Sequence, residues 1–218
     1  MAPLIVTGYV PLKVPRSEND YRRLGARLTA LPGVKLYECG LEDCWMFKPA
    51  NRYADTHGVA DNPQKNTLGY HVVQHQKIAW LTRALDDAPH ADPLIWVDYG
   101  VFHLPGMSET VIRGFMLRVA NSALTQIALP GCWPTNIEVS TRVPCWRFCG
   151  TVAIVPRALV RAFDIGVRVV AMEQLIRERF ATWEVNTWAR LERLVPQVFH
   201  WYEANHDATL FRNFPTRT

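Results

Sequence analysis

Apolar residues recur along this chain with two periods, which together predict alternating strands and helices. Short apolar runs of the kind seen in buried strands are followed by segments in which apolar residues recur every three or four positions. The predicted strands cover 4–10, 34–39, 93–100, 125–130, 148–156 and 198–203. The predicted helices cover 18–31, 67–85, 108–119, 157–180 (with a break near Gly166) and 184–194.

The order of these elements indicates an α/β fold. Strands and helices alternate over the first 130 residues, which predicts a Rossmann-like, mostly parallel sheet with helices on both faces. No internal repeat or linker divides the chain, so we expect a single domain. Ligands of such sheets bind at the carboxyl ends of strands, which directs attention to Thr7, Gly8 and Tyr9, and to Asp98 and Gly100.

The segment 40–66 has no clean period and contains Pro49 and Pro63, and the segment 131–147 contains Pro134 and Pro144. We predict that both are loops. Loops of this length inside a compact domain are usually functional or mobile.

Composition narrows the class of protein. The 218 residues are 49% hydrophobic and 20% charged, as in an ordinary globular chain, and the formal net charge is +4. This mild basicity permits an anionic partner, such as a nucleotide diphosphate or nucleic acid, without requiring one. No signal peptide or membrane span is recognisable, so we expect a cytoplasmic protein with five free thiols. The cysteine spacings C-x4-C and C-x3-C fit zinc sites poorly.

Asp98 is the first candidate for chemistry. It follows the apolar run Leu94–Val97, where a carboxylate needs a partner or a metal. An oxygen ligand at a strand end suits Mg²⁺ or Mn²⁺ bridging a diphosphate. The alternative is a carboxylate that caps the following turn.

Two further candidates lie within predicted elements. Gln74 and Lys77 lie on neighbouring helical turns and would present an amide and a cation together, unless they belong to a solvated helix face. Gly150, after Trp146 and Arg147, permits close approach of the backbone to a ligand, although a β-bulge would also explain it.

The C-terminal third offers a carboxylate and an imidazole. Glu184 begins a predicted helix, where the helix dipole favours a carboxylate, but it is also a candidate general base or nucleophile. Glu173 and Asp207 are the next candidates for that role. His206 would serve as a neutral imidazole ligand for a metal, or be a simple surface histidine, and His103 is its rival.

Taken together these residues resemble a GT-A-type glycosyltransferase. Enzymes of this type begin with a βαβ unit, followed by a helix that carries a Lys and a strand that ends in a DxD-like metal motif. An acceptor-side Gly, a helix that begins with a carboxylate and a C-terminal His come after these. The segments 95–100 and 201–206 are also similar to HtrL/YibB, a small bacterial family grouped with glycosyltransferases. The resemblance implies a hexosyltransferase-like enzyme with 1–106 as the nucleotide-sugar half and 107–218 as the acceptor half. The resemblance assigns catalysis to Glu184 and Asp98, and the binding of a divalent metal, Mn²⁺ or Mg²⁺, to Asp98 and His206. It assigns binding of the nucleotide sugar to Thr7, Gly8, Tyr9, Gln74, Lys77, Trp96 and Gly100. The residues that it assigns to the acceptor side are Trp146, Arg147, Gly150 and Asn186.

The DxD position departs from the family pattern. It reads Asp98-Tyr99-Gly100, so the second carboxylate is missing, and both metal-dependent and metal-independent transfer stay open. The implied donor is a UDP-sugar. The implied acceptor is a hydroxyl of a glycan or of a hydroxymethylated DNA base, held by a small region built from 40–66 and 131–147.

Other classes fit less well. A sugar nucleotidyltransferase should begin with a Gly-rich loop carrying Arg and Lys, and a Rossmann dehydrogenase needs G-x-G-x-x-G; neither motif is present. A non-enzymatic nucleic-acid-binding module stays open, because Trp45 to Tyr53 with His57 and Lys65 is a weak basic and aromatic stripe.

Overall fold

The computed structural model describes residues 6–7, 35, 37, 39–60, 63 and 66–215. The predicted helix at 18–31, the predicted site residues Gly8 and Tyr9, and Lys65 lie outside these residues. Of the predicted strand 4–10, Val6 and Thr7 are described, and they form β1. Of the predicted strand 34–39, residues 35, 37 and 39 are described and have no strand structure.

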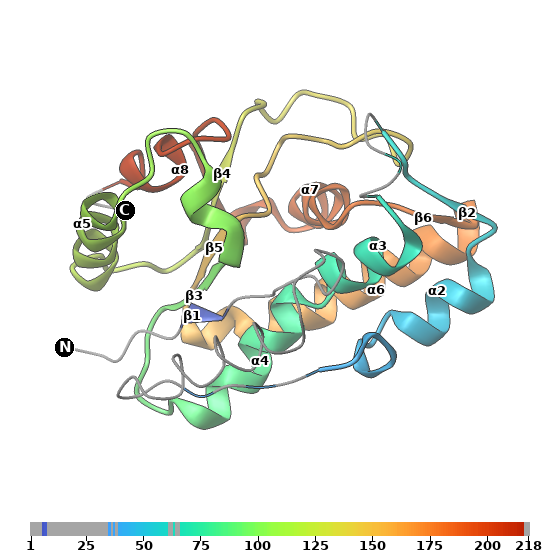
Figure 1. The fold of residues 1–218 in the computed structure, drawn as a ribbon, viewed down its shortest axis with the longest axis horizontal. Coiled ribbons are helices and arrows are strands. Elements are labelled where there is room, and N and C mark those ends of the chain that lie inside the picture. The colour runs from blue at the N-terminus through green and yellow to red at the C-terminus, as the bar shows by residue number, and fades with distance from the viewer. Residues whose placement is uncertain are drawn as a thin grey trace.

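A five-stranded mixed sheet forms the centre of the protein (Figure 1). Its order is β1-β3-β5-β4-β7, with parallel β1–β3 and β4–β7 pairs, while β5 is antiparallel to both of its neighbours. The α/β class is therefore confirmed, but the sheet is mixed, because β5 inserts between the two parallel pairs. The strands are β1 (Val6–Thr7), β3 (Leu94–Val97), β4 (Ile127–Gly131), β5 (Val152–Val155) and β7 (Phe199–Glu203).

Helices cover both faces of this sheet, as the sequence predicts (Figure 1). Alternate strand residues point to opposite faces. Trp96 and Leu129 pack with the layer of α4, α6 and α7, whereas Ile95 and Ala128 pack with the layer of α5 and α8. The helices are α4 (Lys77–Asp87), α5 (Glu109–Ala120), α6 (Val160–Glu178), α7 (Glu184–Leu194) and α8 (Thr209–Arg212).

The segment 40–66, predicted to be a loop, has regular structure in its described residues. It forms a 3-10 helix (Leu41–Asp43), helix α2 (Phe47–Tyr53) and strand β2 (Thr56–His57), which pairs in parallel with β6 (Phe180–Ala181). Its buried residues form a small separate core with residues of α3 (Leu68–His75) and α6. The prediction is wrong because this packing, which the local pattern does not encode, orders the segment.

The predicted helix 67–85 is divided in two. Helix α3 (Leu68–His75) begins at the cap Thr67, whose hydroxyl accepts a hydrogen bond from the backbone, and α4 begins at Lys77. The side chain of Gln76, at the junction, accepts a hydrogen bond from Trp45 N at 3.0 Å. Helix α6, by contrast, runs unbroken through Gly166.

Among the residues that the structure describes, no helix combines the length and the apolar character that crossing a membrane requires.

Candidate functional site

Lys77 is the centre of a buried polar cluster. Its ammonium donates to Gly150 O at 2.8 Å, to Glu184 Oε1 at 2.9 Å and to Asp98 Oδ2 at 3.2 Å. Its side chain is only 3% exposed. A lysine ammonium has three hydrogens, so these contacts use all of them. Four residues predicted from distant parts of the sequence therefore meet at one atom.

Asp98 is the accessible member of this cluster. It follows β3, and its side chain is 33% exposed, against 5% for Glu184. Trp96 Nε1 donates to Asp98 Oδ1 at 2.6 Å, and the buried Trp96 ring stacks on Trp80. The Asp98 side chain makes no capping hydrogen bond to the 3-10 helix Tyr99–His103 that follows it. The carboxylate is thus held by Lys77 and Trp96 and oriented at the end of a central strand.

Glu184 is the first residue of α7, with the same helix bounds that the sequence predicts. Burial raises the pKa of its carboxyl, but the charge of Lys77 and the hydrogen bond from it outweigh burial and lower the pKa below its ordinary value. Burial likewise lowers the pKa of Lys77, yet the Asp98 and Glu184 charges reverse this and raise it. All three groups carry formal charges, and their sum is −1.

Gly150 is required by the close approach of this cluster to the backbone. A Cβ built on Gly150 would lie 2.1 Å from Glu184 Oε1 and 3.2 Å from Lys77 Nζ. Its carbonyl also accepts from Lys77. The glycine packs directly against the charged groups, and the described strand begins two residues later, at Val152.

Two predicted acceptor-side residues hold the 131–147 segment in place. Arg147 forms a buried bidentate ion pair with Glu192 of α7, at 2.6 and 2.8 Å. Asn186 accepts from Cys145 N and donates to Ser140 O, Val143 O and Thr182 Oγ1. Both side chains thus use their hydrogen-bonding groups within the protein.

His206 lies beside two thiols. Its Nε2 is 3.9 Å from Cys149 Sγ, which is 3.6 Å from Cys132 Sγ, and the Trp146 ring packs edge-on against the imidazole. Among the described residues, the only group of three His, Cys, Asp or Glu side chains arranged to hold a metal is this one, and it does not include Asp98. The sequence does not predict this group, because sixteen residues separate the two cysteines and they form no short zinc-binding motif.

The other predicted positions make fewer contacts with the cluster. The Thr7 backbone pairs with Trp96, and Gln74 is half-buried on α3. Gly100 and His103 are exposed on the 3-10 helix after Asp98. The two carboxylates named as the next candidates after Glu184 have local partners. Glu173 pairs with Arg177 on α6, and Asp207 accepts a hydrogen bond from Thr209.

Two buried histidines, His71 and His75, lie one turn apart on α3, the helix that precedes Lys77. No sequence motif indicates this pair. His75 contacts His71 O through Nδ1 and Thr187 Oγ1 through Nε2. His71 Nε2 lies 2.8 Å from Gly58 O, and burial lowers the pKa of His71 to about 4. Burial lowers the pKa of His75 as well. Both rings are therefore neutral at pH 7, and they fasten α3 to α7 and to residue 58.

Trp45, an aromatic residue of the alternative nucleic-acid stripe, is engaged within the protein. Trp45 is half-buried, donates from Nε1 to His75 O, and carries Arg168 above its ring. A ring with these contacts is not available for stacking on a base. Trp45 therefore gives the nucleic-acid module no support.

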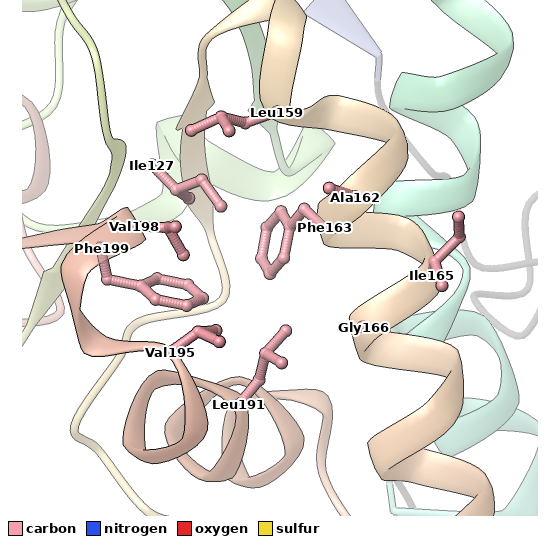
Figure 2. Close-up of a pocket in the computed structure, with 10 residues that line it drawn as sticks. All are labelled: Ile127, Leu159, Ala162, Phe163, Ile165, Gly166, Leu191, Val195, Val198 and Phe199. Carbon is pink, nitrogen blue, oxygen red and sulfur yellow. The ribbon is translucent and has the colours of Figure 1, made fainter.

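An apolar hollow of about 410 Å³ lies away from the polar cluster. Figure 2 shows Phe163 of α6, Leu191 of α7 and Phe199 of β7 around it. It opens near the starts of β4 and β7, whereas Asp98 follows the end of β3. Its lining has no titratable side chain, in contrast to the Lys77 cluster.

Comparisons with protein-family models, curated proteins and solved structures found no match to this chain. Its function is therefore inferred from the arrangement of the chain's own residues.

Proposed function

We propose that this protein is a glycosyltransferase that moves a sugar from a nucleotide-diphosphate sugar, with UDP as the expected nucleotide, to a hydroxyl acceptor. The observation that carries the proposal is the shared lysine. Lys77 Nζ contacts a partly exposed carboxylate, Asp98, and a buried one, Glu184, beside the end of a central strand. Ligands of α/β sheets bind at this kind of edge.

Asp98 is suited to the diphosphate side of such a site. Carboxylate oxygens are the ligands that Mg²⁺ and Mn²⁺ prefer, and a divalent cation would offset the charge of the phosphates. The one-third exposed Asp98 carboxylate and the cluster's formal charge of −1 fit this role. Since His206 groups with two thiols, Asp98 would be the protein ligand that we assign to the cation, with the remaining ligands supplied by phosphate and water.

Lys77 is best described as a positioning residue. All three of its hydrogens are engaged, so it is not available to bind a phosphate without releasing a carboxylate. Its charge keeps Glu184 ionised despite burial. An ionised carboxylate is what a general base or a nucleophile at a sugar C1 requires, and this supports the role proposed for Glu184.

The first test is binding. Purified protein is heated with UDP, and with UDP-, GDP- and ADP-linked hexoses, each with and without Mn²⁺. We expect one nucleotide class to raise Tm, with a larger shift when Mn²⁺ is present. Asp98→Asn should remove the Mn²⁺-dependent part of the shift and leave the unliganded Tm close to that of the wild type. No shift with any nucleotide sugar would contradict the proposal.

The second test separates catalysis from structure in Glu184. With the donor identified, donor hydrolysis or transfer by Glu184→Gln should fall by about a hundredfold or more, at unchanged nucleotide affinity. Glu192→Gln is the matched control, because Glu192 is a buried, ion-paired carboxylate on the same helix whose partner is Arg147. It should lower stability but leave the turnover of folded protein intact. Equal turnover in both variants would mean that Glu184 only balances Lys77.

A further inference from the structure

Three chain segments bring the thiols of Cys132 and Cys149 and the imidazole of His206 together. Cys132 follows β4, Cys149 precedes β5, and His206 follows β7. The ends of the parallel strands β4 and β7 and the start of the antiparallel strand β5 all lie at one edge of the sheet. The three ligand atoms are within 4.8 Å of one another.

Two of the separations between these atoms are close to those of a tetrahedral zinc site. With Zn–S bonds of about 2.3 Å and a Zn–N bond of about 2.0 Å, two sulfurs are separated by about 3.8 Å, and a sulfur and a nitrogen by about 3.5 Å. The observed separations are 3.6 Å between the sulfurs and 3.9 Å between Cys149 Sγ and His206 Nε2. All three ligand atoms lie within 4.8 Å of one another, so side-chain movements of up to about 1 Å would seat the ion.

The backbone holds the two cysteines in this arrangement. Cys132 N donates to Trp146 O at 2.9 Å, and Cys149 N donates to Pro130 O at 2.7 Å. Gly131 approaches the opposite segment so closely that a Cβ there would lie 1.7 Å from Arg147 O. The thiols therefore face each other because the two segments are paired, and the site needs little ordering when a metal binds.

We propose that Cys132, Cys149 and His206 bind one Zn²⁺ ion, with water as the fourth ligand. The ion joins the start and end of the 132–149 connection to the segment after β7. Two thiols lose their protons on binding, so each Zn²⁺ taken up releases two protons to solvent and the bound ion with its two thiolates is neutral. The proposal is independent of glycosyl transfer, since the expected catalytic cation is held by oxygen ligands at Asp98.

Metal titration tests the proposal on the full chain. Reduced protein, freed of metal with a chelator that is then removed, is titrated with Co²⁺ and afterwards with Zn²⁺. We expect one equivalent of Co²⁺ to give the thiolate charge-transfer and visible absorption of a tetrahedral site, and one equivalent of Zn²⁺ to displace it. Zn²⁺ should also raise Tm, and its apparent affinity should weaken about a hundredfold for each pH unit of acidification, as release of two protons requires.

Variants distinguish a metal site from a redox-active thiol pair. His206→Ala, at an exposed position, and Cys132→Ser should each weaken Zn²⁺ binding at least about tenfold, the lower end of the effect expected even for an outer-shell partner. Cys44→Ser is the matched control, because Cys44 is another buried thiol that packs in a separate core, and it should bind as the wild type does. Absence of stoichiometric binding, or binding unaffected by His206→Ala, would overturn the proposal. A Cys132–Cys149 disulfide could also be present in freshly purified wild-type protein and in His206→Ala. That result would overturn the zinc proposal and indicate a redox-active thiol pair instead.

Discussion

Replacing Lys77 by Met is the sharpest test of the buried cluster. Met keeps most of the side-chain volume but removes the ammonium and its three hydrogen bonds. Asp98 retains water, being one-third exposed, whereas Glu184 is left as a buried carboxylate without its cation. Removing one member of a buried ion pair typically lowers stability by about 3–5 kcal/mol, so we expect a loss in this range at pH 7.

The pH dependence of that loss identifies Glu184 as its source. In the wild type the pKa of Glu184 is lowered, so the stabilisation is complete above its ordinary pKa of 4.5 and is lost as pH falls through the folded-state pKa. In Lys77→Met, burial without a cation raises this pKa, so the folded protein takes up the proton first as pH falls. The difference in unfolding free energy between variant and wild type should therefore be smaller at pH 5 than at pH 7.

Urea unfolding followed by circular dichroism at both pH values measures these differences. Arg113→Met is the control, because Arg113 pairs with Glu109 on the surface of α5, where water screens the pair, and its midpoint should change little. Adding Glu184→Gln to Lys77→Met should restore at least about 1 kcal/mol, since the stranded charge is removed. A loss below about 1 kcal/mol, or an equal loss at both pH values, would refute this account of the cluster.

Two further predictions concern a glycine and a histidine near the cluster. Gly150→Ala should displace the Glu184 carboxylate and lower stability by about 1–3 kcal/mol in denaturant titrations, whereas Gly114→Ala, where a Cβ on α5 has only ordinary contacts, should be neutral or slightly stabilising. The pKa of His71 is lowered from 6.5 to about 4, so between these pH values the unfolded chain binds a proton at His71 that the folded protein does not. The free energy of unfolding should therefore fall by about 3 kcal/mol as pH decreases from 6.5 to 4. His71→Gln, which can keep the contact with Gly58 O, should flatten the Tm profile between these pH values; an unchanged profile would exclude His71 as the acid-sensitive group.

Much of the secondary structure could be predicted because its causes are local. Helix 184–194 has the bounds that its apolar spacing predicts, and the apolar run at 93–100 contains β3. Lys77, Asp98, Gly150 and Glu184 could also be proposed from residue type and position, since a carboxylate after a buried strand is unfavourable without a partner. What the pattern does not reveal is that one lysine is the partner of both carboxylates.

The remaining differences have tertiary causes. The helical spacing of 67–85 continues through Gln76, and the division there coincides with a hydrogen bond from Trp45 in a distant segment. The sequence predicts a helix break at Gly166, but a Cβ there would lie 2.9 Å from Leu191, so this glycine instead allows α6 and α7 to approach closely. The thiol and imidazole group depends on which strands are neighbours in the sheet, and neither spacing nor composition encodes that order.

The position of β5 has a consequence for how the protein is made on the ribosome. Strands β3 and β4 are both synthesised before β5. Until β5 pairs between them, β3 has one unpaired edge and β4 has two, because the other neighbour of β4 is β7, which is made last. Unpaired edges of buried apolar strands are sites of aggregation, and contacts between residues far apart in sequence form slowly. A nascent chain that has not yet released residues 152–155 from the exit tunnel cannot complete its sheet. Chaperone demand should therefore be highest in that interval of synthesis, and chains truncated before residue 152 should accumulate as insoluble protein.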